Sequence, residues 1–134
     1  MNNTELALLG YVSWLLVLLV AIEISRTWVV LKTGRAANAF LPDGSDVSPF
    51  VNRLSRAHAN CYESFPFVGG IFLFAIASDN TEVTHSLALW LLAARIAQSG
   101  IHLFSGAVVF TQIRFVFFLI QIAIAVYWLI GFVS

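Results

Sequence analysis

The chain has 134 residues, of which 60% are hydrophobic and 10% charged, with no net charge and a mean hydropathy of +0.88. Soluble domains have about 45–50% apolar and about 25% charged residues, so this composition indicates an integral membrane protein. The balanced charge, without a basic cluster, argues against nucleic acid as a partner. One cysteine excludes an intrachain disulfide, and no cluster of His and Cys predicts a metal site.

Four stretches of mostly apolar residues are long enough to cross a bilayer, which takes about 20 residues. Lipid offers backbone groups no hydrogen-bond partner, so such spans form helices. We therefore predict an all-α membrane protein in which residues 1–134 form a single four-helix transmembrane domain. The predicted spans are about 6–31, 61–77, 83–104 and 113–133, and the second span should start as a polar helix near Phe50.

The connections between the predicted spans differ in charge. The first holds Lys32, Arg35 and Arg53 and the third leads to Arg114, whereas the short second connection has only acidic charges. The positive-inside rule then places loops one and three in the cytoplasm. Both termini are expected outside the cell or in a lumen.

The segment SRAHANCYESFP, residues 55–66, carries polar residues close to where the chain re-enters the membrane. At about 100° per residue, Arg56, Asn60 and Glu63 lie within roughly 60° of one another on one helix face. His58 lies roughly opposite this polar face. Cys61 is expected to be a small buried residue rather than a nucleophile.

A second polar face is predicted in the third span, within ARIAQSGIH; it consists of Arg95, Gln98, Ser99 and His102. Polar faces in lipid are costly unless they meet a partner, so we expect Glu63 to pair with Arg95. Arg56 and Arg114 lie near the same predicted cytoplasmic side. These cations outnumber the one carboxylate, which favours an anionic ligand over the alternative of a purely stabilising network.

In the first span, Glu23 and Arg26 are three residues apart, the spacing of an intrahelical ion pair. A second interpretation takes Glu23 as the intramembrane glutamate of a small proton-coupled drug exporter. Arg26 would neutralise the charge that such a mechanism needs, and the long basic first loop does not fit it. A haem-binding bundle is a weaker alternative, because nothing in the spacing pairs His58 with His102 as axial ligands.

The segment RAHANCYESFP resembles the signature of the MAPEG family, the membrane-associated proteins in eicosanoid and glutathione metabolism. That signature has an Arg, an Asn four residues later, a Glu three residues after that, and a Pro close behind, which Arg56, Asn60, Glu63 and Pro66 match. The third-span segment ARIAQSGIHLF and Arg114, at the start of the fourth span, also fit the family. The resemblance extends over nearly the whole chain.

The resemblance implies a homotrimer with glutathione, as co-substrate, bound between neighbouring protomers near the cytoplasmic side. Arg56, Asn60 and Glu63 would contact glutathione, and Arg95 would brace Glu63. A basic residue late in the first span would also bind glutathione, and Arg114 would be the catalytic residue that stabilises the thiolate. The further contacts implied are Gln98 and His102, and the first-span candidates are Arg26, Lys32 and Arg35.

Glutathione chemistry agrees with these residues. Arginines suit its two carboxylates, Glu63 suits its ammonium group, and a nearby cation lowers the pKa of a thiol. The predicted function is therefore a membrane glutathione transferase or peroxidase-like enzyme, whose thiolate attacks a hydrophobic electrophile that arrives from the bilayer. The alternative is a non-catalytic membrane scaffold or lipid-binding protein on the same fold.

The chain departs from the family pattern at several positions. A tyrosine common in the third helix is His102 here, and the residue after the signature glutamate is Ser64. Phe115 and Phe118 follow Arg114, where prostaglandin-forming members have polar residues. A generic transferase or peroxidase, or a relative that has lost activity, fits this sequence better than an eicosanoid synthase does.

Overall fold

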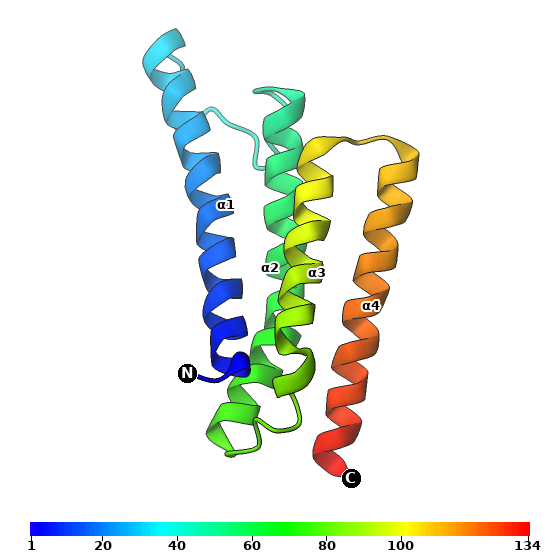
Figure 1. Cartoon of the computed structure of the whole chain (residues 1–134). Helices are drawn as coiled ribbons and strands as arrows, with labels where there is room; N and C mark the ends of the chain where they lie inside the picture. Colours follow the sequence, from blue (N-terminus) through cyan, green and yellow to red (C-terminus); the bar gives the residue numbers. More distant parts are fainter.

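The computed structural model describes all 134 residues and consists of four long antiparallel helices (Figure 1). They are α1 (Asn3–Thr33), α2 (Pro49–Ala77), α3 (His85–Phe104) and α4 (Val108–Val133). Every helix is long and apolar enough to cross a membrane. Even α3, with 20 residues, is about 30 Å long, the thickness of the hydrocarbon core of a bilayer. The prediction of an all-α chain with four candidate spans is confirmed.

Local capping rather than hydropathy determines where α1 begins and ends. At the start of α1, the Asn2 side chain accepts from the Glu5 backbone N–H, and the Glu5 carboxylate accepts from the Asn2 backbone N–H, each at 2.9 Å. This capping box lengthens α1 beyond the predicted span. At its other end Gly34 caps the helix with φ 69°, a left-handed conformation that glycine adopts without strain.

The second and fourth helices differ in how well their starts were predicted. As expected, α2 starts before its apolar part, because Ser48 Oγ accepts from the Val51 N–H at 3.0 Å. In contrast, α4 begins at Val108 rather than near residue 113. Hydropathy alone could not locate this end, because its first turns include the polar Thr111 and Gln112. Arg114 therefore lies inside α4 and not at its start.

The four passes place loops one and three at the same end of the bundle (Figure 1). The two termini and the short turn between α2 and α3 lie at the other end. In the bundle, α1 packs against α2 and α3, while α4 packs mainly against α3 and contacts α2 less closely. No contact joins α1 to α4.

The core lies along the centre of the bundle and contains Tyr11, Phe72 and Trp128, all fully buried. The Tyr11 hydroxyl donates to the Cys61 carbonyl at 2.8 Å and lies 2.6 Å from Ser64 Oγ, so it joins α1 to α2. Many large apolar side chains on the outer faces of all four helices remain exposed. Helices that are apolar on every face are typical of a lipid environment.

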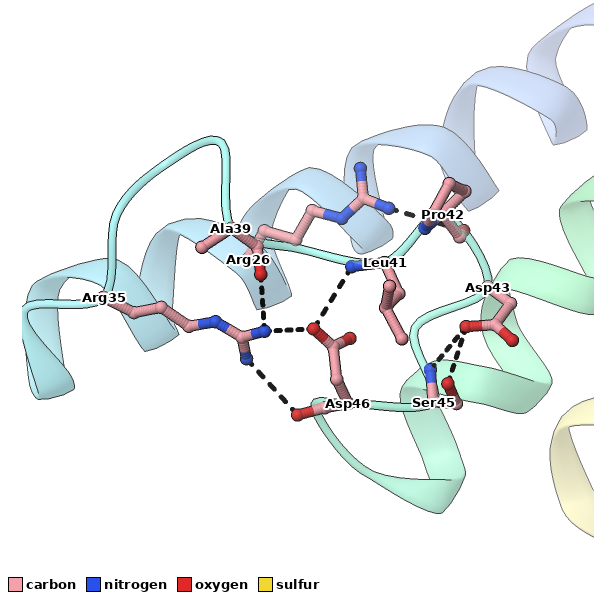
Figure 2. A network of polar contacts seen from close by, with 8 residues as sticks. All are labelled: Arg26, Arg35, Ala39, Leu41, Pro42, Asp43, Ser45 and Asp46. Carbon is pink, nitrogen blue, oxygen red and sulfur yellow. Dashed lines mark hydrogen bonds and ion pairs between the residues drawn. The ribbon is translucent and has the colours of Figure 1, made fainter.

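The first loop is held by a polar network (Figure 2). The Arg35 guanidinium forms an ion pair with the Asp46 carboxylate and donates to the Ala39 carbonyl at 2.7 Å. Asp46 also accepts from the Leu41 N–H at 3.1 Å. Partial burial opposes ionisation of Asp46, but the Leu41 N–H and the Arg35 guanidinium outweigh it and hold the pKa of this carboxyl below its usual range. The loop is therefore an ordered part of the fold.

Candidate functional site

A cavity of about 630 Å³ lies between α2, α3 and α4, in the half of the bundle nearest loops one and three. It brings together every sequence-predicted site residue except Arg26. The 12 residues that line it are Arg56, Asn60, Glu63, Ser64, Phe67, Arg95, Gln98, His102, Thr111, Arg114, Phe115 and Phe118. The polar faces predicted separately for the second and third spans thus border one cavity, apart from Ser99, which is buried outside its lining.

One contact joins these polar faces directly. Asn60 Nδ2 on α2 donates to His102 Nδ1 on α3, at 3.4 Å. Asn60 is exposed, whereas His102 is buried. In this orientation the amide nitrogen donates, and the tautomer of His102 that accepts at Nδ1 has its proton on Nε2.

The prediction that Glu63 and Arg95 form an ion pair is wrong. The chain has two ion pairs, Arg26–Glu23 and Arg35–Asp46, and neither lies at the cavity. Glu63 is exposed, whereas Arg95 is 1% exposed, so the two charges border the same cavity at different depths. The structural role assigned to Arg95, bracing Glu63, therefore has no support in the geometry.

Arg95 is an unusual buried charge, because its Nε and Nη2 are both buried without a hydrogen-bond partner. An unpaired buried charge is strongly unfavourable in a membrane protein. Arg114 is held differently: its Nη2 donates to Thr111 Oγ1 at 2.9 Å, while its Nε is buried and unpaired. Arg56 is exposed and makes no hydrogen bond within the chain. The three arginines thus retain donors for a further group.

The charge of the cavity is strongly unbalanced. Three arginines against the single carboxylate of Glu63 leave it a formal charge of +2. Phe67, Phe115 and Phe118 form the apolar part of its lining. No three His, Cys, Asp or Glu side chains gather where they could hold a metal ion. The donor set therefore suits an anionic organic group better than a cation.

Several residues considered from the sequence lie outside the cavity. Arg26 pairs with Glu23 at 3.5 Å, as predicted from their spacing, and its Nη2 lies 3.5 Å from the Pro42 carbonyl. His58 faces away from the cavity and stacks beside Tyr62, with ring centroids 6.5 Å apart. Cys61 is fully buried, which agrees with its expected role as a small packing residue.

Sequence reasoning missed two polar residues at the site, Thr111 in the lining of the cavity and Gln121 behind it. Gln121 lies in α4, the most apolar of the helices, and is completely buried. Its Nε2 donates to Gln98 Oε1 at 2.8 Å and to the Phe117 carbonyl at 3.1 Å. Arg95 was identified because a polar residue in a membrane span is energetically costly, and the same argument applies to Gln121.

The fold and the site together define an all-helical, multi-pass membrane protein with a basic cavity inside its helix bundle. The bilayer is its environment. The model of the MAPEG family matches residues 6–134, essentially the whole chain. The chain therefore belongs to the MAPEG family. Comparisons with curated proteins and with solved structures found no match.

Proposed function

We propose that the chain is a membrane glutathione transferase or peroxidase-like enzyme, and that residues 1–134 act as a single transmembrane domain. The observation that carries the proposal is the cavity of about 630 Å³ that gathers Arg56, Arg95 and Arg114 around only one carboxylate, Glu63. Membership of a family that includes glutathione-using proteins supports the same ligand.

Glutathione complements this set of charges. It has two carboxylates and one ammonium group, and its thiolate form carries a further negative charge. Arginines bind carboxylates through paired, charge-assisted hydrogen bonds, and Glu63 is available for the ammonium group. The thiolate form has a net charge of about −2, opposite to the formal charge of the cavity, so the cavity favours ionised glutathione.

Arg114 is the proposed catalytic residue, because its cationic side chain lies beside Phe115 and Phe118, where an apolar acceptor would dock. The thiol proton leaves to water, and the sulfur lone pair forms a bond to the electrophilic carbon as the leaving group departs with its electron pair. With a hydroperoxide, sulfur takes the outer oxygen and the alcohol is released. A second glutathione then reduces the sulfenic acid to give the disulfide and water.

The cavity of one protomer has no residue from α1 in its lining. A glutathione contact from Arg26 would therefore have to come from α1 of a neighbouring protomer. This supports the proposal of a homotrimer with sites between protomers, closed in the symmetric way that most oligomers are. The proposed orientation has loops one and three, and hence the cavity, on the cytoplasmic side, with the termini outside or in a lumen.

The experiment that tests the proposal is stopped-flow absorbance of the purified protein mixed with glutathione. The thiolate absorbs near the ultraviolet edge where the thiol does not, so thiolate formation at neutral pH should appear as a rapid rise. Calorimetry on the same sample should show binding at millimolar glutathione or below. Absence of binding in calorimetry would exclude the function.

The alternative, a non-catalytic scaffold or lipid-binding protein, predicts that the polar faces are needed for folding. Arg56 discriminates between the two, because it is exposed and makes no hydrogen bond or ion pair within the chain. Under the proposed function, Arg56→Ala leaves the folded oligomer intact and weakens glutathione binding. Loss of the folded oligomer would favour the scaffold instead.

A further inference from the structure

The buried amide of Gln121 has an orientation that the backbone determines. Its Nε2 lies 3.1 Å from the Phe117 carbonyl, which can only accept a hydrogen bond. The nitrogen of the Gln121 amide must therefore be on this side, since its oxygen would repel the carbonyl. The same nitrogen lies 2.8 Å from Gln98, so Gln98 must present its Oε1 there.

This arrangement determines what Gln98 presents to the cavity. With Oε1 turned towards Gln121, the Nε2 of Gln98 makes no hydrogen bond within the chain, and it is not sealed from solvent. Gln98 lines the cavity, whereas Gln121 is completely buried behind it. The amide of Gln98 is thus held as a donor, although a free glutamine can turn either its nitrogen or its oxygen towards a ligand.

The residues one turn before and one turn after Gln98 on α3 also present hydrogen-bond donors. Arg95 lies one turn before Gln98, lines the same cavity and has only donors. His102 lies one turn after it, and its Nδ1 is occupied as an acceptor by Asn60. The face of α3 that borders the cavity therefore has donors at three successive turns and no free acceptor.

We propose that Gln121 is a positioning residue of this site: through its hydrogen bond to Gln98 it holds the Gln98 amide as a donor beside Arg95, in the subsite where one carboxylate of the ligand binds. The proposal rests on the proposed function, since it takes the ligand to be glutathione. A buried glutamine in the most apolar helix is costly, and a purely structural link between α3 and α4 would not need a particular amide polarity.

The test is a double-mutant cycle on glutathione affinity, measured by calorimetry on the purified oligomer. Gln98→Met removes the donor and should weaken binding about tenfold or more, as expected for a hydrogen bond to a charged group. Gln121→Met lets the Gln98 amide turn and should weaken binding by roughly three- to tenfold. In the Gln98→Met background, Gln121→Met should have no further effect on affinity.

A merely structural Gln121 gives a different result. The thermal unfolding temperature would then fall, with glutathione affinity either unchanged or reduced equally in both backgrounds, and this outcome would overturn the positioning role. If the single variants do not fold, Gln98→Glu is the second probe, because it keeps an acceptor for Gln121 and places a carboxylate in the cavity. It should retain the folded oligomer and lose glutathione binding, and unchanged binding would overturn the subsite.

Modified ligands show whether a carboxylate is the partner. One probe is glutathione esterified at its glycine carboxylate, and the other is 4-aminobutyryl-cysteinyl-glycine, which lacks the γ-glutamyl carboxylate. The probe that lacks the carboxylate bound at this subsite should bind wild type and Gln121→Met with equal affinity. Equal proportional losses for glutathione and both probes would overturn the subsite while leaving the proposed function intact. Wild-type protein that binds no glutathione at all would overturn both.

Discussion

The three arginines of the cavity differ in how firmly the chain holds them. Arg114 is tethered through Nη2 to Thr111 Oγ1, Arg95 is buried with two unpaired donors, and Arg56 is exposed and unbonded. A tethered cation keeps its position and therefore its electrostatic effect on a bound group. Together with the position of Arg114 beside Phe115 and Phe118, this tether supports the proposed role of Arg114 at the thiolate and of the other two arginines in binding.

Replacing Arg114 with glutamine should raise the pKa of the bound glutathione thiol by about 1–3, because the nearby cation that favours the thiolate is lost. The fraction of thiolate at neutral pH should then fall about tenfold or more, as measured by ultraviolet absorbance during a pH titration. Arg53→Gln is the matched control, since Arg53 donates to the Leu103 carbonyl at 3.0 Å and lies outside the cavity. Equal losses in both variants would contradict the assignment.

Among the helices, α2 contributes five of the 12 residues that line the cavity, more than α3 or α4, and it packs against α1. The Tyr11 hydroxyl contacts the Cys61 carbonyl and Ser64, which lines the cavity together with Asn60 and Glu63. A hydroxyl from α1 therefore stabilises the turn of α2 that borders the cavity. Loop one, which joins these two helices, is ordered by its own ion pair (Figure 2).

Tyr11→Phe should lower the free energy of unfolding by about 0.5–1.5 kcal/mol, the usual net value of a buried hydrogen bond, which in membranes is often at the lower end. Ser64 limits the loss because its Oγ lies 3.2 Å from both the Asn60 and Cys61 carbonyls. Unfolding in detergent measures the change. Tyr127→Phe, at a side chain 62% exposed on α4, is the control and should have no effect.

The order of loop one should depend on pH through Asp46. The pKa of its carboxyl is lowered in the folded chain, so its contribution is present above the unfolded value of about 3.9 and is lost as the pH falls through the lower folded value. Amide exchange at Leu41, corrected for intrinsic rates, should accelerate below about pH 4 in wild type and at every pH in Asp46→Asn. Asp43→Asn, which removes only local bonds to Ser45, should leave Leu41 protected. Faster exchange at Leu41 in Asp43→Asn would contradict the role of Asp46.

For the whole molecule, the outer surface of the bundle bears on whether the site lies between protomers. Large apolar side chains are exposed on all four helices, and α1 and α4 do not touch within one chain. No residue of α1 lines the cavity, and Glu23 and Arg26 lie on the outside of the bundle. A site completed by α1 of another copy would cover exposed apolar side chains and would bring the outward-facing Arg26 to the cavity.

Subunit complementation tests this arrangement. Arg26→Ala and Arg114→Ala should each abolish or strongly reduce glutathione conjugation, since each removes one half of every site. Co-expressed in a cyclic homotrimer, the two variants should recover activity, because about a quarter of the sites pair an intact Arg114 with a neighbour's intact Arg26. Activity per mole of mixed oligomer is the measurement. If the mixture is as inactive as its parts, the site does not lie between protomers.

The fold class was predictable because the membrane restricts it so strongly. Long apolar stretches in lipid can only be helices, and their number and order followed from the sequence. The ends of the helices were less predictable, as α4 shows, because the polar residues Thr111, Gln112 and Arg114 interrupt the apolar pattern of its first two turns. The spacing of Arg56, Asn60 and Glu63 indicated one helix face without any structure, since helical periodicity is local.

The class of protein, the four apolar helices and the two polar faces can therefore be read from local sequence patterns, because all of them depend on neighbours within a few turns. How these faces meet follows from the packing of the helices. This packing separated Glu63 from Arg95, removed Arg26 from the cavity of its own chain, and placed Gln121 behind Gln98. Such pairings depend on the rotation and depth of each helix against its neighbours, which is a property of packing and not of any local sequence pattern.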